Sequence, residues 1–480
     1  MNAFTDPAHL AIPAEFTSTL ATQRAHFEAN RYPSYEQRVA DLKQVVRLVA
    51  DNQQALIEAV NQDYGCRSSF ETSFAEIAVT LDGLQDAIKS LKGWMKPQKR
   101  HVDMMRMPLA KARLVAQPVG VVGIVVPWNF PLAMVFHPLT SIFAAGNTAM
   151  VKMSENSNHT ARLLKSLSAR YFPESKLAFF EDGGGRGPAF TSLPFDHIFF
   201  TGSPATRQAG VANAARHPAP VTLELGGKSP AIIAPDYDMA SAAKRVMWAK
   251  TLNAGQICTN IDYLFVPEGK TQPFVEEAIK AFKASYPDIN NGTYTAVIDQ
   301  RSYERLNAAL DDARSKGATV VELAEGQAPD ASRRIMGPKI VLGVTDDMDL
   351  MQREIFGPIL PVRTYRTREE VAGYINDRPR PLALYPFTND KSLADWYIMN
   401  TLSGGVTVND SVLHVSVHSL PFGGVGNSGM GHYHGYEGFT TFSKMRPILY
   451  QGPIRSINFL AAPYGPTARK ILNMMIRMKS

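Results

Sequence analysis

One of the two cysteines of this chain, Cys258, lies where a reactive side chain can be displayed. It follows Gly255, whose missing side chain allows close backbone approach, and it lies between a predicted helix and a predicted strand. A cysteine thiolate can attack a carbonyl carbon and form a covalent intermediate. The alternative is an inert core thiol, the common fate of free cysteine. We expect Cys66 to have no chemical role, because its neighbours are typical of a polar loop.

Such a nucleophile needs an oxyanion donor and a base for hydrolysis, and the sequence offers one residue for each. Asn129 follows the predicted strand 119–126, at the end where open α/β sheets place their ligands, and a side-chain amide can donate to developing negative charge. Glu224 is flanked by apolar residues of a predicted strand, where burial raises a carboxylate's pKa and suits it to general-base work. The alternatives are a turn asparagine and an edge-strand glutamate paired with Lys228.

The elements that would position these residues alternate along the chain. After a helical stretch at about 35–93, short apolar strands are predicted at 119–126, 148–152, 177–180, 197–200 and 221–225, with helices at 132–145, 158–170 and 204–216. A second block predicts helices at 238–252, 272–283 and 302–315 and strands at 263–266, 339–342 and 359–364. Continuous apolar strands separated by helices indicate parallel sheets covered on both faces, so we expect an α/β protein with two successive domains.

Composition limits the class of protein. The 480 residues are 45% hydrophobic and 20% charged, which excludes a largely disordered chain. Two cysteines are too few for a disulfide-stapled scaffold or a four-cysteine zinc site. The formal net charge of +6 is mild for this length and argues against a dedicated nucleic-acid binder. We interpret the basic stretch at 89–113 as a solvated face or a subunit contact.

Targeting signals are absent from the sequence. The N-terminal residues lack a signal-peptide pattern, and no apolar stretch is long and uninterrupted enough for a membrane span, so we expect a cytoplasmic protein. The tail at 469–479 interleaves basic and apolar residues in a way that could form a surface-seeking amphipathic helix. We expect instead that this tail packs on its own protein or on a partner subunit.

Three groups of residues suggest sites whose requirements they do not meet. GKS at 227–229 lacks the earlier glycine of a P-loop, because that position is Thr222. GVGNSG at 424–429 matches a dinucleotide-binding pattern by letters, but it follows no predicted strand, so we interpret it as a loop. Four histidines lack the cysteine or carboxylate partners of zinc sites, so we expect surface or loop residues and no metal. These are His414, His418, His432 and His434.

With these residues in place, the chain resembles the aldehyde dehydrogenase superfamily over roughly 35–442. Six motifs occur in the family order, and the 34 positions between Glu224 and Cys258 match the family separation. The motifs are PWNFP at 127–131, FTGS at 200–203, LELGGK at 223–228, GQIC at 255–258, EIFGP at 354–358 and PFGG at 421–424. Any one of them alone would be weak, whereas six in order are highly specific.

The resemblance implies a mechanism and a cofactor. Cys258 attacks an aldehyde to give a thiohemiacetal, and Asn129 with the Cys258 backbone N–H stabilises the oxyanion. Hydride passes to the nicotinamide and leaves a thioester, and Glu224 activates water to release the carboxylic acid. The implied cofactor-binding residues are Trp128, Lys152, Glu155, Gly202, Ser203, Glu354 and Phe356.

Each of these cofactor residues has an implied place. Lys152 and Glu155 hold the adenosine ribose, and Glu155 favours NAD because a carboxylate repels a 2′-phosphate, although NADP use stays open. Gly202 and Ser203 begin a helix whose N-terminus suits the pyrophosphate. Two further residues, Glu354 and Phe356, then hold the nicotinamide ribose and pack near the ring.

The resemblance also implies the domain organisation. A Rossmann-like dinucleotide-binding domain spans 1–226 and includes part of a small oligomerisation arm near 90–115. A second α/β domain, the catalytic domain, spans 227–420, and 421–480 returns to the cofactor domain and the arm before the tail. The expected assembly is a homodimer.

The finer motifs narrow the expected substrate. Residues 194–203 and 421–431 resemble the class-3 branch, and 285–288 and 463–465 are similar to bacterial coniferyl-aldehyde dehydrogenases. We therefore expect a bulky aromatic or long-chain aldehyde, with Trp248 either lining its pocket or lying in the core. Three alternatives stay open: an enzyme for small aliphatic aldehydes or semialdehydes, an enzyme that releases its product to coenzyme A, and a binding protein without activity.

Overall fold

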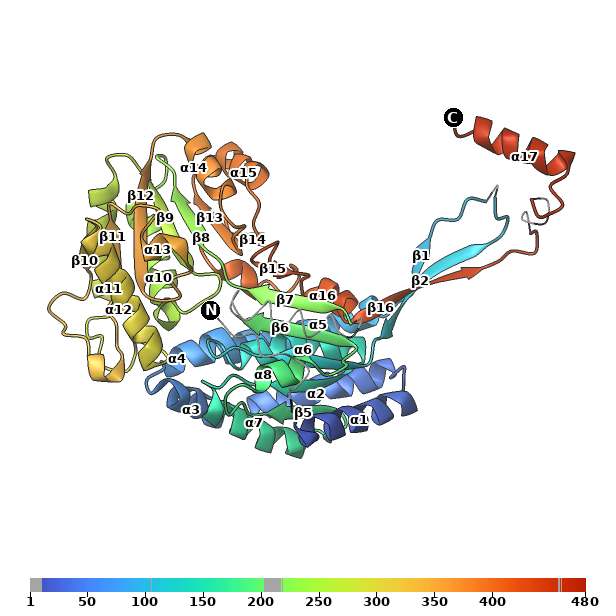
Figure 1. The fold of residues 1–480 in the computed structure, drawn as a ribbon, viewed down its shortest axis with the longest axis horizontal. Coiled ribbons are helices and arrows are strands. Elements are labelled where there is room, and N and C mark those ends of the chain that lie inside the picture. Colours follow the sequence, from blue (N-terminus) through green and yellow to red (C-terminus); the bar gives the residue numbers. More distant parts are fainter. Residues whose placement is uncertain (1–10, 105, 203–216, 218, 456–457, 459) are drawn as a thin grey trace.

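The computed structural model describes residues 11–104, 106–202, 217, 219–455, 458 and 460–480. The helix predicted at 204–216 and the cofactor residue Ser203 lie outside these ranges. Two sheets make up the body of the molecule, and a third, small sheet projects from it (Figure 1).

The first sheet is Rossmann-like and has the strand order β15-β7-β6-β3-β4-β5. Its parallel strands are β3 (Val121–Val125), β4 (Thr148–Lys152), β5 (Leu177–Phe180), β6 (His197–Gly202) and β7 (Val221–Leu225). The short β15 (Gly429–Met430) adds to β7 in the antiparallel sense. All five parallel strands lie where the sequence predicts them, because each contains the mainly apolar run that a buried strand of a parallel sheet requires.

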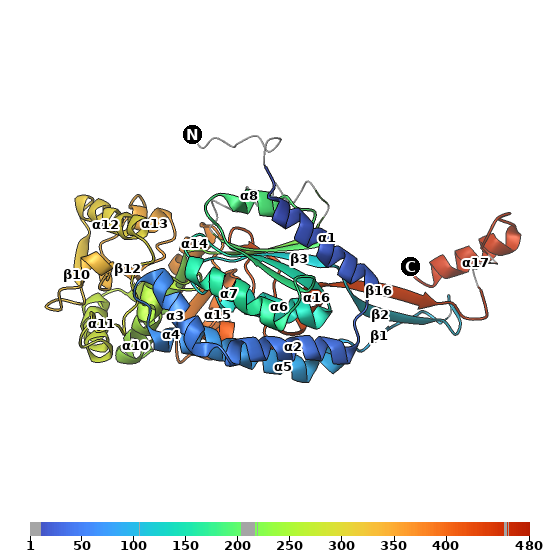
Figure 2. The same ribbon diagram turned by 90° about the horizontal axis from the view of Figure 1, so that it is seen from below.

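Helices cover both faces of this sheet (Figure 2). One face carries α1 (Ala14–Ala29) and α8 (Arg186–Thr191), whereas the other carries α6 (Ala133–Ala145), α7 (Asn158–Tyr171) and α16 (Gly435–Thr441). Beyond α6 lie α2 (Tyr35–Ala50) and α5 (Val79–Trp94), with α3 (Gln53–Tyr64), α4 (Ser69–Thr72) and the π-helical turn Ser73–Ala78 completing that layer. Alternate residues of β3 face opposite clusters, as the two-residue period of a strand requires.

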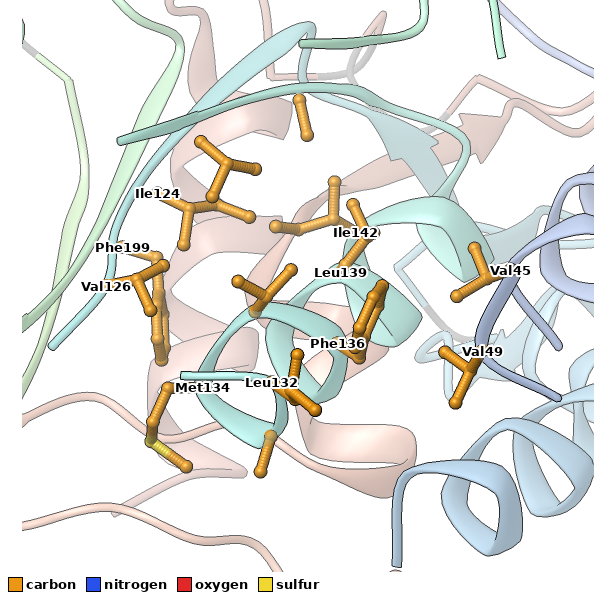
Figure 3. Packing of buried hydrophobic residues seen from close by; sticks show 14 of the residues in the cluster. Val45, Val49, Ile124, Val126, Leu132, Met134, Phe136, Leu139, Ile142 and Phe199 are labelled. Atoms are coloured by element: carbon orange, nitrogen blue, oxygen red, sulfur yellow. The ribbon is translucent and has the colours of Figure 1, made fainter. Parts of the chain in front are cut away.

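Helix α6 is buried on every side because it lies between the sheet and the outer helices. All thirteen of its residues are buried, and such a helix must be apolar around its whole circumference. Figure 3 shows Phe136, Leu139 and Ile142 of α6 between Ile124 of β3 and Val49 of α2. The helix begins four residues after Asn129, so its burial also anchors the segment that carries that side chain.

The second sheet has seven strands in the order β10-β11-β12-β9-β8-β13-β14. They are β8 (Ser229–Ile233), β9 (Ile261–Pro267), β10 (Thr319–Glu322), β11 (Lys339–Leu342), β12 (Ile359–Tyr365), β13 (Ala383–Phe387) and β14 (Gly405–Val406). Only β10 runs antiparallel to its neighbour. The helices of this unit are α10 (Met239–Thr251), α11 (Thr271–Ser285), α12 (Gln300–Ser315), α13 (Asp349–Gln352), α14 (Arg368–Asn376) and α15 (Lys391–Asn400), with short 3-10 turns at Leu252–Gly255, Ala331–Arg333 and Leu413–Ser416. The predicted strands and helices of this block are confirmed, whereas β8, β10, β13 and β14 were not predicted.

The third sheet forms an arm that stands out from the body (Figure 1). It consists of β1 (Gln98–Arg100), β2 (Lys111–Pro118) and β16 (Ser443–Tyr450), all antiparallel, and α17 (Pro466–Arg477) lies beyond its end. Within its own chain the tail helix buries one residue, Ala468, so the tail packs little on its own protein, and packing on a partner subunit stays a prediction. The domain boundaries at 226 and 420 stay predictions. No helix in the described part of the chain could span a bilayer.

Candidate active site

Cys258 follows a tight turn that joins α10 to β9. Three successive residues adopt left-handed backbone angles, with φ of 51° at Asn253, 49° at Ala254 and 73° at Gly255. A Cβ at Gly255 would overlap the carbonyl oxygen of Gly357, so glycine is required there for both reasons. Such strain persists only where the surroundings hold it, and it is common at functional sites.

Side-chain hydrogen bonds hold this turn in place. The Asn253 amide donates to the backbone oxygens of Asn129 and Gln256, both at 3.0 Å. The Gln256 amide donates to the Ala296 carbonyl at 3.0 Å and its oxygen accepts from the Ile298 N–H at 3.0 Å. Cys258, two residues further on, is partly exposed at the end of a rigid support.

The structure brings Asn129 to this turn. Its side-chain Nδ2 donates to the Gln256 carbonyl at 3.2 Å, and the second N–H of that amide is available to another acceptor. Its backbone oxygen accepts from the Tyr64 hydroxyl at 2.9 Å and from Arg67 at 3.0 Å. The asparagine is therefore more than a turn residue, because its amide and its backbone are both fixed against the cysteine turn.

Glu224 lies on β7, opposite Gly429 of β15 and Thr201 of β6. Its side chain is buried, and neither carboxylate oxygen has a hydrogen-bond partner in the described part of the chain. The alternative pairing with Lys228 is wrong, since the Lys228 ammonium pairs with Asp262 and donates to the Leu350 carbonyl at 2.7 Å. A buried carboxylate without a partner is costly, and groups of this kind call for a functional reason.

The electrostatics of the site favour protonated acids. Burial raises the pKa of Glu224 well above its usual value. Burial also raises the pKa of Glu354 to about 8, with Asp262 adding to the effect. The pKa of Cys258 rises to about 12, first because of burial and then because the negative charges of Glu354 and Glu224 oppose a thiolate. The thiol must therefore pass its proton to an acceptor before it can attack.

Two predicted cofactor residues, Trp128 and Phe356, meet edge to face with their ring centroids 5.3 Å apart. Phe356 has a φ of 50°, and the segment that carries it is held by Asp262, which accepts from the Ile355 N–H at 2.9 Å. Beside it, the carboxylate of Glu354 lies so close to Gly226 that a Cβ there would overlap it. One oxygen of Glu354 has no partner in the described part of the chain, which fits a group that awaits a hydroxyl donor.

The other predicted cofactor residues lie at the carboxyl ends of the first sheet's strands. Lys152 ends β4 and is buried in an ion pair with Asp182, which follows β5. Glu155, three residues on, is exposed, and Gly202 ends β6. Strand ends of an open α/β sheet are the usual place for a dinucleotide, so these residues and the Trp128–Phe356 pair fit NAD(P).

A buried ion pair supports the site and was not predicted. Arg67 and Glu76 lie 3.3 Å apart, and both side chains are 0% exposed. Glu76 accepts from the Leu132 N–H at 2.7 Å and the Ala133 N–H at 3.2 Å, so it caps the start of α6, while Arg67 holds Asn129. The loop predicted around Cys66 is present between α3 and α4, but it is not solvent-exposed, because Cys66, Arg67 and Ser68 are all buried.

Arg67→Met is expected to destabilise the protein by about 3–5 kcal/mol, because Glu76 would remain as a buried charge without a partner. Urea denaturation would measure the loss, with Arg47→Met on exposed α2 surface as the matched control. Adding Glu76→Gln should restore part of the stability by removing the orphaned charge. Equal stability of Arg67→Met and the control would contradict a structural role for the pair.

The four histidines do not all lie at the surface. His432 is exposed, but His434 is buried and the side chain of His418 is 11% exposed. The rings of His434 and His137, which lies on α6, are 5.2 Å apart. Burial lowers the pKa of His137 to about 3 and that of His434 well below its usual value. No group of three or more ligating side chains among the described residues is placed to hold a metal ion.

Trp248, considered above for a substrate pocket, reaches a small cavity between α10 and α11. That cavity has a volume of about 50 Å³, and Tyr286 and Phe282 of the α11 region line it. Trp248 also packs against the apolar cluster that includes Phe130. Cys258 packs against the same cluster.

Taken together, the site holds a thiol, an amide donor and a carboxylate that has no partner within the described ranges, at the junction of two sheets. The thiol can add to an electrophilic carbon, the amide can donate to the resulting oxyanion, and the carboxylate can accept a proton from water. This set of groups suits acyl chemistry on a carbonyl compound.

Comparisons with known proteins agree on one family. A model described as the aldehyde dehydrogenase family matches residues 8–448. The chain is 46% identical over 460 residues to a probable coniferyl aldehyde dehydrogenase of Pseudomonas aeruginosa, covering 95% of each protein. It is 42% identical over 458 residues to a coniferyl aldehyde dehydrogenase of another Pseudomonas strain, covering 95% of this chain and 94% of the relative. A solved structure of Staphylococcus aureus AldH in a substrate-bound state has a TM-score of 0.89 and 31% identity, covering 96% of this chain and 99% of that one.

Proposed function

Because this chain belongs to the aldehyde dehydrogenase family, we propose that it uses Cys258, Asn129 and Glu224 to oxidise a bulky aromatic aldehyde of the coniferyl type. The chain is an NAD(P)-dependent aldehyde dehydrogenase, which converts an aldehyde to a carboxylic acid. The observation that carries the finer proposal is Glu224, a buried carboxylate with no partner among the described residues, at the same site as a partly exposed thiol.

The residues divide the reaction between them. The Cys258 thiol passes its proton to water and its sulfur forms a bond to the aldehyde carbon, leaving an oxyanion that the Asn129 amide and the Cys258 N–H can bind. When bound, NAD(P) supplies the two-electron acceptor that turns this adduct into a thioester. Glu224 then takes a proton from water, the water oxygen bonds to the acyl carbon, and the C–S bond breaks to release the acid. Retention of this base favours water over coenzyme A as the acceptor.

A panel of aldehydes tests this function. Coniferyl aldehyde, cinnamaldehyde, hexanal, acetaldehyde and succinic semialdehyde would be offered with NAD or NADP while nicotinamide reduction and acid formation are followed. We expect the highest kcat/KM for the aromatic aldehydes and no dependence on coenzyme A. A preference for acetaldehyde or the semialdehyde would overturn the substrate class, and no reduction with any aldehyde would favour a non-catalytic protein.

We infer a preference for NAD from Glu155, which is exposed three residues after Lys152 at the end of β4 and accepts a hydrogen bond from the Ser154 hydroxyl at 3.2 Å. A carboxylate near the adenosine ribose accepts from a 2′-hydroxyl and repels a 2′-phosphate. Glu155→Gln should therefore raise the ratio of kcat/KM for NADP to that for NAD about tenfold. Glu58→Gln, which neutralises another exposed glutamate, serves as the control and should leave the ratio unchanged. If the NADP-to-NAD ratio of kcat/KM is unchanged in both variants, Glu155 does not select the cofactor.

We also infer a cytoplasmic homodimer. The arm formed by β1, β2 and β16 stands away from the body and exposes Leu449 and Tyr450, which is expected of a strand that meets another subunit. Light scattering coupled to size-exclusion chromatography would measure the assembly, and a monomer would contradict the inference.

A further inference from the structure

The carboxyl ends of β4 and β5 carry a buried ion pair where the ribose of a dinucleotide is expected. Read from β3, the parallel strands β5-β4-β3-β6-β7 follow the strand order of a Rossmann fold, in which β4 is the second strand. In that fold, residues after the second strand contact the ribose that distinguishes NAD from NADP. Lys152 ends β4, and Asp182 lies two residues after Phe180, which pairs with Lys152 in the sheet.

Asp182 is fixed through both of its carboxylate oxygens. Oδ2 accepts from the Lys152 ammonium, whereas Oδ1 accepts from the Gly184 N–H at 2.9 Å and from the Arg186 N–H at 3.2 Å. The side chains of Lys152 and Asp182 are only 6% and 4% exposed. Burial acts to raise the pKa of Asp182, but the Lys152 ammonium and the two N–H groups outweigh it and hold that pKa below its usual value. Asp182 is therefore ionised at neutral pH and compensates the charge of Lys152.

Other cations near these strand ends are paired as well. The Arg162 guanidinium of α7 lies 3.0 Å from the Glu181 carboxylate, and Arg186 pairs with Glu15 of α1. Glu155 adds a further, exposed carboxylate after β4. A Rossmann sheet that accommodates a 2′-phosphate usually offers it an arginine. Here three cations each face a carboxylate, so the strand ends present an excess of negative charge.

Space beside the Lys152 ammonium is open. A Cβ built on Gly187 would lie 3.7 Å from Lys152 Nζ and would meet no other group of the described residues within 4 Å, apart from its chain neighbours. The exposed glycines at 183–185 also have nothing from the described ranges within 4 Å of a Cβ position. We therefore expect charge, rather than a lack of room, to decide whether a phosphate reaches Lys152.

We propose that Asp182 selects NAD over NADP by pairing with Lys152 and withholding its charge from a 2′-phosphate. An ammonium has three donors, so Lys152 can donate to an uncharged ribose hydroxyl and keep Asp182. A phosphate would have to compete with a carboxylate that two N–H groups hold in place. Asp182 is a positioning residue that acts through Lys152 and adds to the effect of Glu155. The inference rests on the proposed placement of Lys152 at the adenosine ribose.

Cofactor binding without turnover tests the proposal on the full-length enzyme. Isothermal titration calorimetry would measure the dissociation constants of NAD and NADP. D182N and D182S both remove the charge and keep an oxygen that can accept from the Gly184 N–H, so either variant tests the proposal if the other fails to fold. Each should lower the dissociation constant of NADP at least about tenfold, because a charge close to the phosphate is removed. That of NAD should change by less than about threefold. An unchanged ratio of the two constants would overturn the proposal.

Three further variants show whether Asp182 acts through Lys152. K152M/D182N should lose the gain in NADP affinity, because the cation that binds the phosphate is gone. D182E retains the charge and should keep the preference of the unmodified enzyme. E181Q removes the neighbouring, partly exposed carboxylate as a matched control and should leave the ratio unchanged. An equal gain in E181Q would indicate a general electrostatic effect, and a gain that survives in K152M/D182N would place the phosphate elsewhere. Either result would overturn the proposal.

K152M alone separates this proposal from the proposed cofactor site. It should weaken NAD binding about tenfold, because a donor to the ribose is lost. If K152M weakens NAD binding but D182N leaves the NADP-to-NAD ratio unchanged, the cofactor site stands and the role of Asp182 is overturned. If K152M leaves NAD binding unchanged, Lys152 does not hold the ribose and both proposals are overturned. The identity of the aldehyde affects none of these measurements.

Discussion

Cys258→Ala is expected to lower the rate of aldehyde oxidation by a factor of at least about 10⁴, because Cys258 is the proposed nucleophile and the one other cysteine of the chain is Cys66. Cys66 cannot replace it, since that thiol is buried beside Tyr294 and Arg333 at a separate location. Binding of NAD, followed by fluorescence quenching, should stay within about threefold of the unmodified enzyme because the Trp128–Phe356 pair and Glu354 are unchanged.

Cys66→Ala is the matched control for this prediction. It removes the chain's other thiol from the core, where free cysteine behaves as a small apolar residue, so it should cost some stability and no catalysis. Turnover by Cys258→Ala at a rate comparable with this control would rule out Cys258 as the nucleophile. Loss of activity in both variants would point to a damaged fold, which thermal denaturation would reveal.

Glu224→Gln is expected to slow thioester hydrolysis by about 10²–10⁴, the usual contribution of a positioned general base. The first turnover should survive, because the oxidation step does not need this base, so one equivalent of reduced nicotinamide should form in a burst. Intact-protein mass spectrometry should then find the acyl group on Cys258. Full steady-state activity without a trapped acyl-enzyme would contradict the assignment, and Glu58→Gln controls for loss of a surface carboxylate.

The raised pKa of Glu224 also sets the direction of the pH dependence. Only the ionised carboxylate can take a proton from water, so hydrolysis by the unmodified enzyme should slow as the pH falls through that raised pKa. The residual hydrolysis of Glu224→Gln should lack this limb. Rapid-quench measurement of acyl-enzyme decay between pH 6 and pH 9 would show the difference.

Because burial raises the pKa of Glu224, this residue lowers the stability of the folded protein at alkaline pH. Its pKa in the folded state lies above the unfolded value of 4.5, so the folded protein holds this proton more tightly than the unfolded chain does. Stability from this group is therefore complete below pH 4.5 and decreases as the pH rises toward the folded-state pKa. The Tm of Glu224→Gln should exceed that of the unmodified enzyme by a margin that grows from pH 5 to pH 9, whereas a constant margin would contradict a buried, titrating carboxylate.

Much of the fold followed from short-range patterns. Strands β4, β5 and β7 begin and end at the predicted residues, because a parallel sheet between two helical layers requires continuous apolar runs and few other elements do. Strand β14 was missed because its two residues are too few to show a pattern. The burial of Glu224 was also readable, since its neighbours on the strand are apolar.

The sequence patterns did not predict which distant residues pair in the folded protein. Whether Lys228 met Glu224 or Asp262 depended on the relative placement of β7, β8 and β9, and spacing along the chain carries no information on that choice. The Arg67–Glu76 pair was missed for the same reason, because a run of polar residues looks alike whether it faces solvent or forms a buried network. The burial of His434 was not predicted, because α6 places His137 beside it from nearly three hundred residues away.

The sequence by itself determined the family and the α/β class, and it supplied the three proposed reacting groups, because motif residues and hydrophobic periodicity are local properties. Only the tertiary structure decided that Asn129 donates into the cysteine turn, that Trp128 meets Phe356, and that Ala468 is the one residue that α17 buries. Each of these depends on how separate elements pack, and packing is a cooperative property of the whole chain that no single segment encodes.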